Sequence, residues 1–372
     1  MDFSFDESQN AVRDLAKKLC ETESTTERLK EIERGPERID RALWSELAKA
    51  SLLGVGLAED VGGGALGFTP VCLVLEQLGR SVAYVPYLST IVLGALPIDR
   101  FGTLKQRERY LPKVVAGESM LTAALAEVGI DDPAKPAVTA SRDGGGWRLN
   151  GVKIAVPAGM AADFVLVPAR TGDNTTGVFV VARTAGGVSW EAQAETSGEI
   201  AGRLTLKDAW VGGEDELGDP FEGATIVRWI VDRALVALAA QEVGICDRAV
   251  RMTAEYATIR QQFDRPIATF QAVAQRVADA YIDADSIRLA LWQAAWLIDQ
   301  DRPASREAAI AKFWAAEGGH RVVSAAQHVH GGMGFDRDYP LHRYYLWSKQ
   351  IELTLGGANA QLSRLGTMLR EG

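Results

Sequence analysis

The spacing of apolar residues changes twice along the chain, and this double change limits the possible folds more than any single motif does. Residues 1–117 carry apolar side chains at helical spacing, as at Ala11 and Leu15. Residues 118–220 carry short alternating or β-branched runs, and helical spacing returns over residues 221–372. The sequence therefore predicts an α+β protein with an N-terminal all-α domain, a middle β domain resembling a barrel, and a C-terminal bundle of about four long helices.

One dipeptide in the middle section suggests a tight turn. Asn150 and Gly151 stand between two strand-like runs, GWRL and VKIAV. Both residue types tolerate the positive φ angles of a type I′ turn, so the pair predicts a β-hairpin at this point.

The charge balance limits the partners of the chain. The net charge is −9, and no block of five or six like charges occurs, so neither nucleic acid nor a membrane surface is expected as a partner. The N-terminal segment is acidic and amphipathic, and no window holds 18 uncharged apolar residues. We expect a cytoplasmic protein.

A turn between two helical segments has the features of an anion site. Arg260 ends the first helical segment and is followed by amides, an aromatic residue and a proline before the next helix. A guanidinium group binds phosphate through two donors, and the N-terminus of a helix adds free N–H groups. The alternative is a surface arginine that caps the last carbonyls of its own helix.

A second segment, QHVHGGMGF at residues 327–335, combines histidines with glycines that allow a ligand to approach the backbone closely. Glu317 and His320 nearby have the spacing of a metal-binding pair. A di-iron bundle requires two such pairs and two further carboxylates, whereas this chain has one pair and only four histidines. We therefore predict no metal site.

Several segments together resemble the acyl-CoA dehydrogenase family over the whole chain. They are YATIRQQFDRPIATFQ, GTLKQRERYLPKVVAGE, LAEDVGGGALGF, LNGVKIAVPAG and HVHGGMGFDRDYPLHRYY. The resemblance implies the same three-part fold and an FAD cofactor shared across a subunit interface. It implies that the residues contacting FAD are Arg260, Gln262, Phe263, Gln271, His328, Val329, His330, Gly331 and Gly332. It also implies at least a dimer, an acyl-CoA substrate and an electron-transfer flavoprotein as electron acceptor.

The chain departs from the family pattern where flavin contacts are expected. Ala126-Glu127-Val128 stands in place of Thr-Glu-Pro, and Gly129-Ile130-Asp131 in place of Gly-Ser-Asp. Ala155-Val156-Pro157 stands in place of Trp-Ile-Thr. Hydroxyl groups are lost at both places, and Pro157 has no N–H to donate.

The catalytic carboxylate of the family also has no counterpart. Family members remove the α-proton of the thioester with a glutamate, and the two known positions of this base correspond to Gly356 and Ala234. Neither residue can accept a proton. Glu242, Glu352 and Asp232 are nearby candidates for a substitute. Helix geometry places Glu242 and Asp232 away from the expected point, and Glu352 lies about one turn before Gly356.

Three functions remain open. The first is a subunit of a heteromeric acyl-CoA dehydrogenase whose related partner supplies the catalytic glutamate. The second is a self-sufficient dehydrogenase, assembled from copies of this chain, with a non-standard base. The third is a non-catalytic acyl-CoA or flavin-binding protein, or a flavin enzyme with oxygen-directed chemistry on the same scaffold.

Overall fold

The N-terminal part of the chain is helical. The computed structural model describes residues 4–371. The elements of this part are α1 (Glu7–Glu23), α2 (Thr26–Arg34), α3 (Arg41–Lys49), η1 (Glu59–Val61), α4 (Phe68–Arg80), η2 (Leu88–Ala95), α5 (Leu96–Phe101) and α6 (Leu104–Val115). Two helices begin with reciprocal capping boxes, Asp6 with Gln9 at α1 and Thr103 with Gln106 at α6. The Gln106 amide also donates to the carbonyls of Glu214 and Glu216, which ties α6 to the β domain.

The middle part is a seven-stranded sheet in the order β1-β4-β2-β3-β7-β6, with β5 paired to β4. The strands are β1 (Leu121–Ala123), β2 (Thr139–Asp143), β3 (Gly146–Val156), β4 (Phe164–Gly172), β5 (Thr175–Ala182), β6 (Val188–Ala194) and β7 (Ile200–Gly212), followed by the short helix η3 (Gly213–Asp215). Its separate core includes Trp147 and Phe179.

The predicted turn at Asn150 and Gly151 is wrong. Both residues lie inside the long strand β3, and the hairpin turn lies earlier, where Asp143 pairs with Gly146. The positive φ of Gly151, +140°, coincides with a bulge where the pairing of β3 with β7 shifts. Gly151 therefore forms part of a β-bulge and not of a turn, and its missing Cβ leaves room for the side chain and the Cα of Val138.

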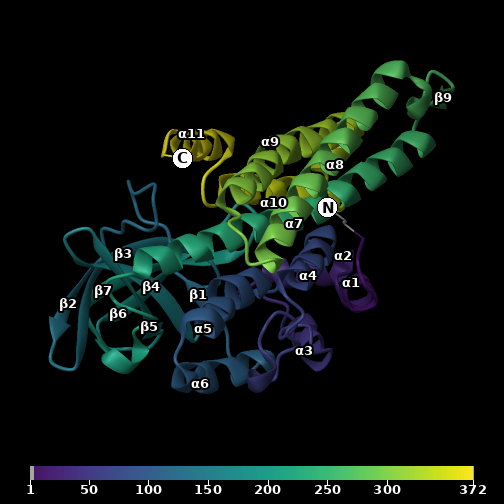
Figure 1. The fold of residues 1–372 in the computed structure, drawn as a ribbon. Helices are drawn as coiled ribbons and strands as arrows, with labels where there is room; N and C mark the ends of the chain where they lie inside the picture. Colours follow the sequence, from purple (N-terminus) through teal and green to yellow (C-terminus); the bar gives the residue numbers. More distant parts are fainter. Residues whose placement is uncertain (1–3, 372) are drawn as a thin grey trace.

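The C-terminal part is a bundle of long helices that extends away from the sheet (Figure 1). Its elements are α7 (Gly223–Ile259), β8 (Gln261–Gln262), β9 (Arg265–Pro266), η4 (Ile267–Thr269), α8 (Gln271–Asp299), α9 (Ser305–His330), η5 (Gly331–Phe335), α10 (Leu341–Leu353) and α11 (Ala358–Glu371). The α+β architecture predicted from the sequence is confirmed.

The bundle and the N-terminal helices share one apolar core. Helices α4 and α7 cross in direct backbone contact, because Gly79 lies against the carbonyl of Gln241 and Gly244 against the carbonyl of Glu76. A side chain at either glycine would push the helices apart. This crossing fixes the position of α7, whose middle section forms one wall of the candidate site.

Candidate functional site

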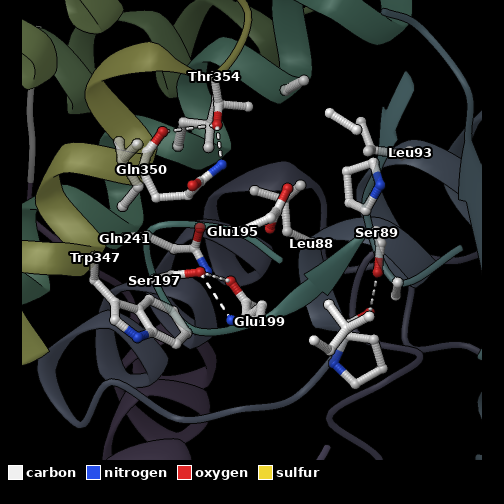
Figure 2. A pocket seen from close by; sticks show the side chains of 18 of the residues that line it. Leu88, Ser89, Leu93, Glu195, Ser197, Glu199, Gln241, Trp347, Gln350 and Thr354 are labelled. Carbon is white, nitrogen blue, oxygen red and sulfur yellow. Dashed lines mark hydrogen bonds between the residues drawn. The ribbon is translucent and has the colours of Figure 1, made fainter. Parts of the chain in front are cut away.

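A cavity of about 340 Å³ lies where the three parts of the chain meet (Figure 2). It is bounded by η2, the end of β3, the turn between β6 and β7, the middle of α7, and the end of α10. Most of its wall is apolar, including Leu88, Leu93, Leu238, Ile351 and Leu355. A cavity of this size, with apolar walls and a few polar groups, is typical of a small-molecule site.

The polar groups of the wall gather on one side. The carboxyl groups of Glu195 and Glu199 lie toward the Ser197 hydroxyl and the Gln241 amide (Figure 2). The Ser197 hydroxyl donates to the Glu199 carboxylate at 3.0 Å. Within residues 4–371, the side chains of Glu195 and Gln241 have no hydrogen-bond partner. The cavity therefore presents an unpaired carboxyl group and an unpaired amide.

The environment of these two glutamates favours their neutral forms. Burial, together with the neighbouring charge of Glu199, raises the pKa of Glu195 well above its usual range. Burial also raises the pKa of Glu199, although the hydrogen bond from Ser197 opposes this shift. Because the two carboxyl groups repel each other when both are charged, the pair holds a proton at pH values where an exposed glutamate is ionised.

The turn that carries both glutamates is held from two sides. The Arg38 guanidinium donates to the carbonyl of Gly198 at 2.6 Å, and the Tyr84 hydroxyl donates to the carbonyl of Ser197 at 2.9 Å. On the bundle side, the backbone N–H of Thr196 donates to the Gln350 side chain at 2.9 Å. These contacts keep the carboxyl groups at the cavity.

The two positions that the resemblance assigns to the catalytic base lie at or beside the cavity. Ala234 is fully buried and lines its wall from α7. Gly356 follows the lining residue Leu355 in a turn where the φ angles are +55° at Leu355 and +90° at Gly356. The buried ammonium of Lys312 holds this turn by donating to the carbonyls of Glu352 at 3.0 Å and Gly356 at 3.1 Å.

Two of the three acidic residues considered as substitutes for the catalytic base make contacts inside the bundle. Glu242 is fully buried and accepts hydrogen bonds from Ser348 at 2.7 Å and from Cys246 at 3.3 Å. Burial raises its pKa to about 7, and burial lowers the pKa of the neighbouring Lys312 to about 8. Asp232 accepts from Ser305 and pairs with Arg364 at 2.6 Å.

Glu352 is the third candidate, and it pairs with Lys349 at 2.7 Å. None of the three carboxylates is among the residues that line the cavity. Glu195 and Glu199 are the glutamates that face it from the β domain. The sequence does not predict these two residues as site residues. Its only local indication is the turn Thr196-Ser197-Gly198 between two strand-like runs.

Three of the positions that depart from the family pattern also line the cavity. They are Ala126, Ala155 and Pro157. The N–H of Ala155 donates to the side chain of Gln193 at 2.8 Å, and the carbonyl of Pro157 accepts from Thr122 at 2.7 Å. Ala126, Ala155 and Pro157 therefore provide no side-chain hydroxyl or amide to a ligand.

The predicted anion site lies at the other end of α7, on a projecting tip formed by β8 and β9 (Figure 1). Arg260, Gln262, Phe263 and Gln271 are all exposed there, and Phe263 is 87% exposed. The Arg260 guanidinium has no hydrogen bond or ion pair within residues 4–371, so it does not cap its own helix. No side chain caps the N-terminus of α8 either, which leaves backbone N–H groups free for an anion.

The second predicted segment lies at the C-terminal end of α9 and close to the end of α7. The ring of His330 stacks on Tyr256 with centroids 4.4 Å apart. His330 is buried, and its two nitrogens contact the Ala326 carbonyl and the Tyr339 hydroxyl. His328, Gly331 and Gly332 are exposed, and Val329 is half-buried. A ligand can therefore reach the backbone of the glycines but not the ring of His330.

The projecting tip and the cavity are far apart. Gln241 lines the cavity, and Arg260 follows 19 positions later along a continuous helix. At 1.5 Å per residue the separation is roughly 28 Å. The tip points away from the cavity of its own chain (Figure 1).

Metal ligands do not gather in the described part of the chain. Among residues 4–371, no group of three or more His, Cys, Asp or Glu side chains could hold a metal ion. No helix in the same range is long and apolar enough to cross a membrane.

Comparison with known proteins identifies the class. Residues 6–118 match the family model described as the N-terminal domain of acyl-CoA dehydrogenases, and residues 222–369 match the model of the C-terminal domain. Acyl-CoA dehydrogenase FadE27 of Mycobacterium tuberculosis is 40% identical over 100% of this chain and 99% of its own length. FadE28 of the same organism is 32% identical over 87% of this chain and 91% of its own length.

Two solved structures are similar over almost their whole length. A variant of the Tcur3481–Tcur3483 steroid acyl-CoA dehydrogenase has a TM-score of 0.92 at 45% identity, covering 98% of each chain. The ChsE4–ChsE5 complex from Mycobacterium tuberculosis has a TM-score of 0.94 at 40% identity, covering 100% of each chain. The chain belongs to the acyl-CoA dehydrogenase family, whose members are FAD-dependent oxidoreductases that act on CH–CH bonds.

The tip and the cavity fit FAD unequally. At the tip, the free guanidinium of Arg260, the uncapped N-terminus of α8 and the open backbone at Gly331 and Gly332 suit a pyrophosphate group. At the cavity, Ala126, Ala155 and Pro157 provide no polar side chain for a flavin ring.

Proposed function

We propose that this chain is one subunit of a heteromeric acyl-CoA dehydrogenase and that a related partner chain supplies the catalytic glutamate. The observation that carries the proposal is the contrast along α7. The tip retains the residues expected to hold a cofactor across an interface, while the cavity holds no carboxylate at either expected base position. Similarity to chains of the ChsE4–ChsE5 complex and of the Tcur3481–Tcur3483 enzyme supports a partner of the same family.

The electrostatics of the cavity support the same proposal. Removal of an α-proton from the thioester requires an ionised base. Burial raises the pKa of Glu195 and of Glu199, and a carboxyl group that keeps its proton cannot accept another one. The cavity of this chain is therefore a poor place for the oxidation step.

The roles of this chain in the assembly follow from its own residues. Bound FAD supplies the hydride acceptor in this family. Arg260 and the N-terminus of α8 would hold the pyrophosphate of a cofactor whose flavin ring lies in the partner. Gln262, Phe263, Gln271 and the backbone at residues 328–332 would complete this contact. By resemblance, an electron-transfer flavoprotein would accept the electrons.

The relatives also suggest a substrate class. One solved relative is a steroid acyl-CoA dehydrogenase at 45% identity. We infer that the assembled enzyme acts on the CoA thioester of a bulky, steroid-derived acyl group.

The proposal is tested by expressing the chain alone and together with a related chain encoded beside it. Flavin absorbance per chain and its bleaching by acyl-CoA without oxygen are measured in both preparations. Flavin and bleaching only in the co-expressed pair support the proposal. A stable chain that retains flavin and bleaches on its own contradicts it.

The second candidate is a self-sufficient dehydrogenase whose base is Glu195. The unpaired carboxyl group of Glu195 at the cavity wall is the observation that favours it. Under this candidate, Glu195→Gln abolishes bleaching by the chain alone, whereas Glu242→Gln leaves it unchanged.

A further inference from the structure

His330 lies at the base of the glycine-rich loop of residues 331–338, which follows α9. It is 3% exposed, whereas the residues of the loop are exposed apart from Gly334. The resemblance counts His330 among the residues that contact FAD. A ring that is buried in this way does not reach a ligand bound at the surface of the tip, and its contacts within the chain indicate another role.

The two ring nitrogens of His330 close the loop at its base. Nδ1 lies 2.8 Å from the carbonyl of Ala326, one turn earlier on α9, and Nε2 lies 3.0 Å from the Tyr339 hydroxyl. Because a carbonyl oxygen only accepts, Nδ1 carries the proton, and in the neutral ring Nε2 accepts from Tyr339. Burial lowers the pKa of His330, which favours this neutral form at pH 7. The bond to Tyr339 therefore joins the two ends of the loop.

The same ring joins the loop to the C-terminal end of α7. The rings of His330 and Tyr256 are stacked, with centroids 4.4 Å apart and an angle of 23° between their planes. Tyr256 lies one helical turn before Arg260, and its carbonyl accepts the Arg260 N–H at 2.8 Å. Stacked aromatic pairs stabilise a contact beyond the area that they bury. The stack therefore connects Arg260 to the glycine backbone, which lies far from it in the sequence.

We propose that the His330 ring is a positioning group that holds the backbone of residues 331–332 at a fixed place relative to Arg260. It acts through the hydrogen bond with Tyr339 and the stack on Tyr256. Both segments are expected to contact one cofactor, so their separation has to match that molecule. A loop that samples other arrangements binds more weakly, in proportion to the time spent in the competent one. The inference rests on the proposed function for the cofactor contact at the tip.

Tyr339→Phe tests the bond directly, because it removes one hydroxyl and keeps the ring. The dissociation constant of FAD is measured by fluorescence titration on the complex of this chain with its partner. We expect a rise of about fivefold, as for the loss of one net hydrogen bond. The rate of flavin bleaching by acyl-CoA at saturating FAD should be unchanged, because excess FAD selects the competent arrangement. A constant that does not rise, or a rate that stays low at saturation, overturns the proposal.

Tyr110→Phe is the matched control for Tyr339→Phe. Tyr110 lies on α6, far from the tip (Figure 1), and its buried hydroxyl donates to Asp215 at 2.6 Å. This variant also loses a hydroxyl hydrogen bond, so it shows what a general loss of stability does to the complex. We expect it to leave the dissociation constant of FAD unchanged. An equal rise in both variants would overturn the positioning role.

A second variant tests whether His330 and Tyr339 act through one bond. His330→Phe keeps a ring that can stack on Tyr256 but removes both ring hydrogen bonds, and we expect it to weaken FAD binding about tenfold. Adding Tyr339→Phe to it should cause no further loss, because the shared bond is already absent. A double variant whose loss equals the product of the two single losses would contradict the proposal.

The loop can also be followed in the chain alone, without cofactor or partner. The N–H groups of Asp336 and Tyr339 donate to the carbonyls of Met333 and Asp336 within this segment, so their hydrogen exchange reports on its order. We expect Tyr339→Phe to accelerate exchange over residues 331–339 by at least about threefold and Tyr110→Phe to leave it unchanged. Equal exchange in the unaltered chain and Tyr339→Phe overturns the proposal.

Arg260→Ala separates a failure of this inference from a failure of the proposed function. If Arg260→Ala weakens FAD binding and Tyr339→Phe does not, the cofactor contact stands and His330 has no positioning role. If neither variant changes the dissociation constant of FAD, the cofactor contact at the tip is itself wrong, and both proposals are overturned.

Discussion

The C-terminal end and the middle section of α7 face different environments, and the difference separates two kinds of function. The end near Arg260 is exposed, and its guanidinium has no partner among the described residues. The middle section near Ala234 is buried and forms one wall of a cavity held in shape by Lys312 and the turn after β6. An unpaired side chain on the surface can bind another molecule, whereas buried side chains in the cavity wall mainly fix the shape of the cavity. Substitutions near Arg260 should affect the assembly with the partner, and substitutions near Ala234 should affect the stability of the chain.

The largest effect on stability is expected at Lys312. Its buried ammonium donates to the carbonyls of Glu352 and Gly356 and lies near the charge of Glu242. Lys312→Met removes these bonds and leaves Glu242 without a nearby cation, so we expect a loss of about 3 kcal/mol in the free energy of unfolding. Denaturant unfolding measures it, with the exposed Lys105→Met as the matched control. A loss equal to that of the control would show that the turn after α10 does not depend on Lys312.

The next effect concerns the exposed tip. Arg260→Ala removes the charged donor for the pyrophosphate, and we expect the assembled enzyme to lose about 2 kcal/mol of FAD affinity, roughly thirtyfold. The free energy of unfolding of the chain should hardly change. Flavin absorbance after gel filtration measures the loss.

Arg228→Ala is the control for Arg260→Ala, because Arg228 is an exposed arginine near the opposite end of the same helix. Equal flavin retention in the two variants would argue against a cofactor contact at the tip.

A smaller effect is expected at the turn beside the cavity. Gly356 has a φ of +90°, and a Cβ there would lie 2.8 Å from the Cβ of Ala360. Gly356→Ala should therefore destabilise the chain by about 1–2 kcal/mol. Gly366→Ala in the exposed part of α11 meets no atom within 4 Å and should stabilise it by up to about 1 kcal/mol. Thermal unfolding compares the two, and changes of the same sign would contradict the strained geometry at Gly356.

A separate effect is a dependence of stability on pH. The pKa values of Glu195 and Glu199 are raised in the folded chain by burial, so the native state binds more protons than the unfolded state above the ordinary glutamate range. The free energy of unfolding should therefore fall as the pH rises from about 4.5 toward 8.

The double variant Glu195→Gln with Glu199→Gln should reduce this slope. Some slope remains, because burial raises the pKa of Glu242 to about 7 as well. Glu118→Gln, at an exposed carboxylate, is the control and should leave the slope unchanged. A slope that is the same in the double variant would mean that the pair is ionised in the folded chain.

The sequence predicted the architecture because the periods of its apolar residues differ clearly between helices and strands. It failed at Asn150 and Gly151, since the same glycine conformation serves a turn or a bulge and only the pairing with β7 decides between them. The sequence indicated the residues of the exposed tip because they follow one another along the chain. The sequence did not predict Glu195 and Glu199 as site residues. The cavity is formed by residues from η2, β3, α7 and α10, which lie far apart in the sequence, and no local sequence pattern indicates that they come together.

If the acyl group is not oxidised in the cavity of this chain, a side chain that fills the cavity should leave the reaction of the assembled enzyme intact. Ala126→Phe places an aromatic ring in the space without altering the tip. The variant is co-purified with its partner, and the extent of flavin bleaching by acyl-CoA is compared with that of the unaltered complex. We expect the same extent of bleaching, whereas a fall to half or less would mean that this cavity is itself a site of oxidation.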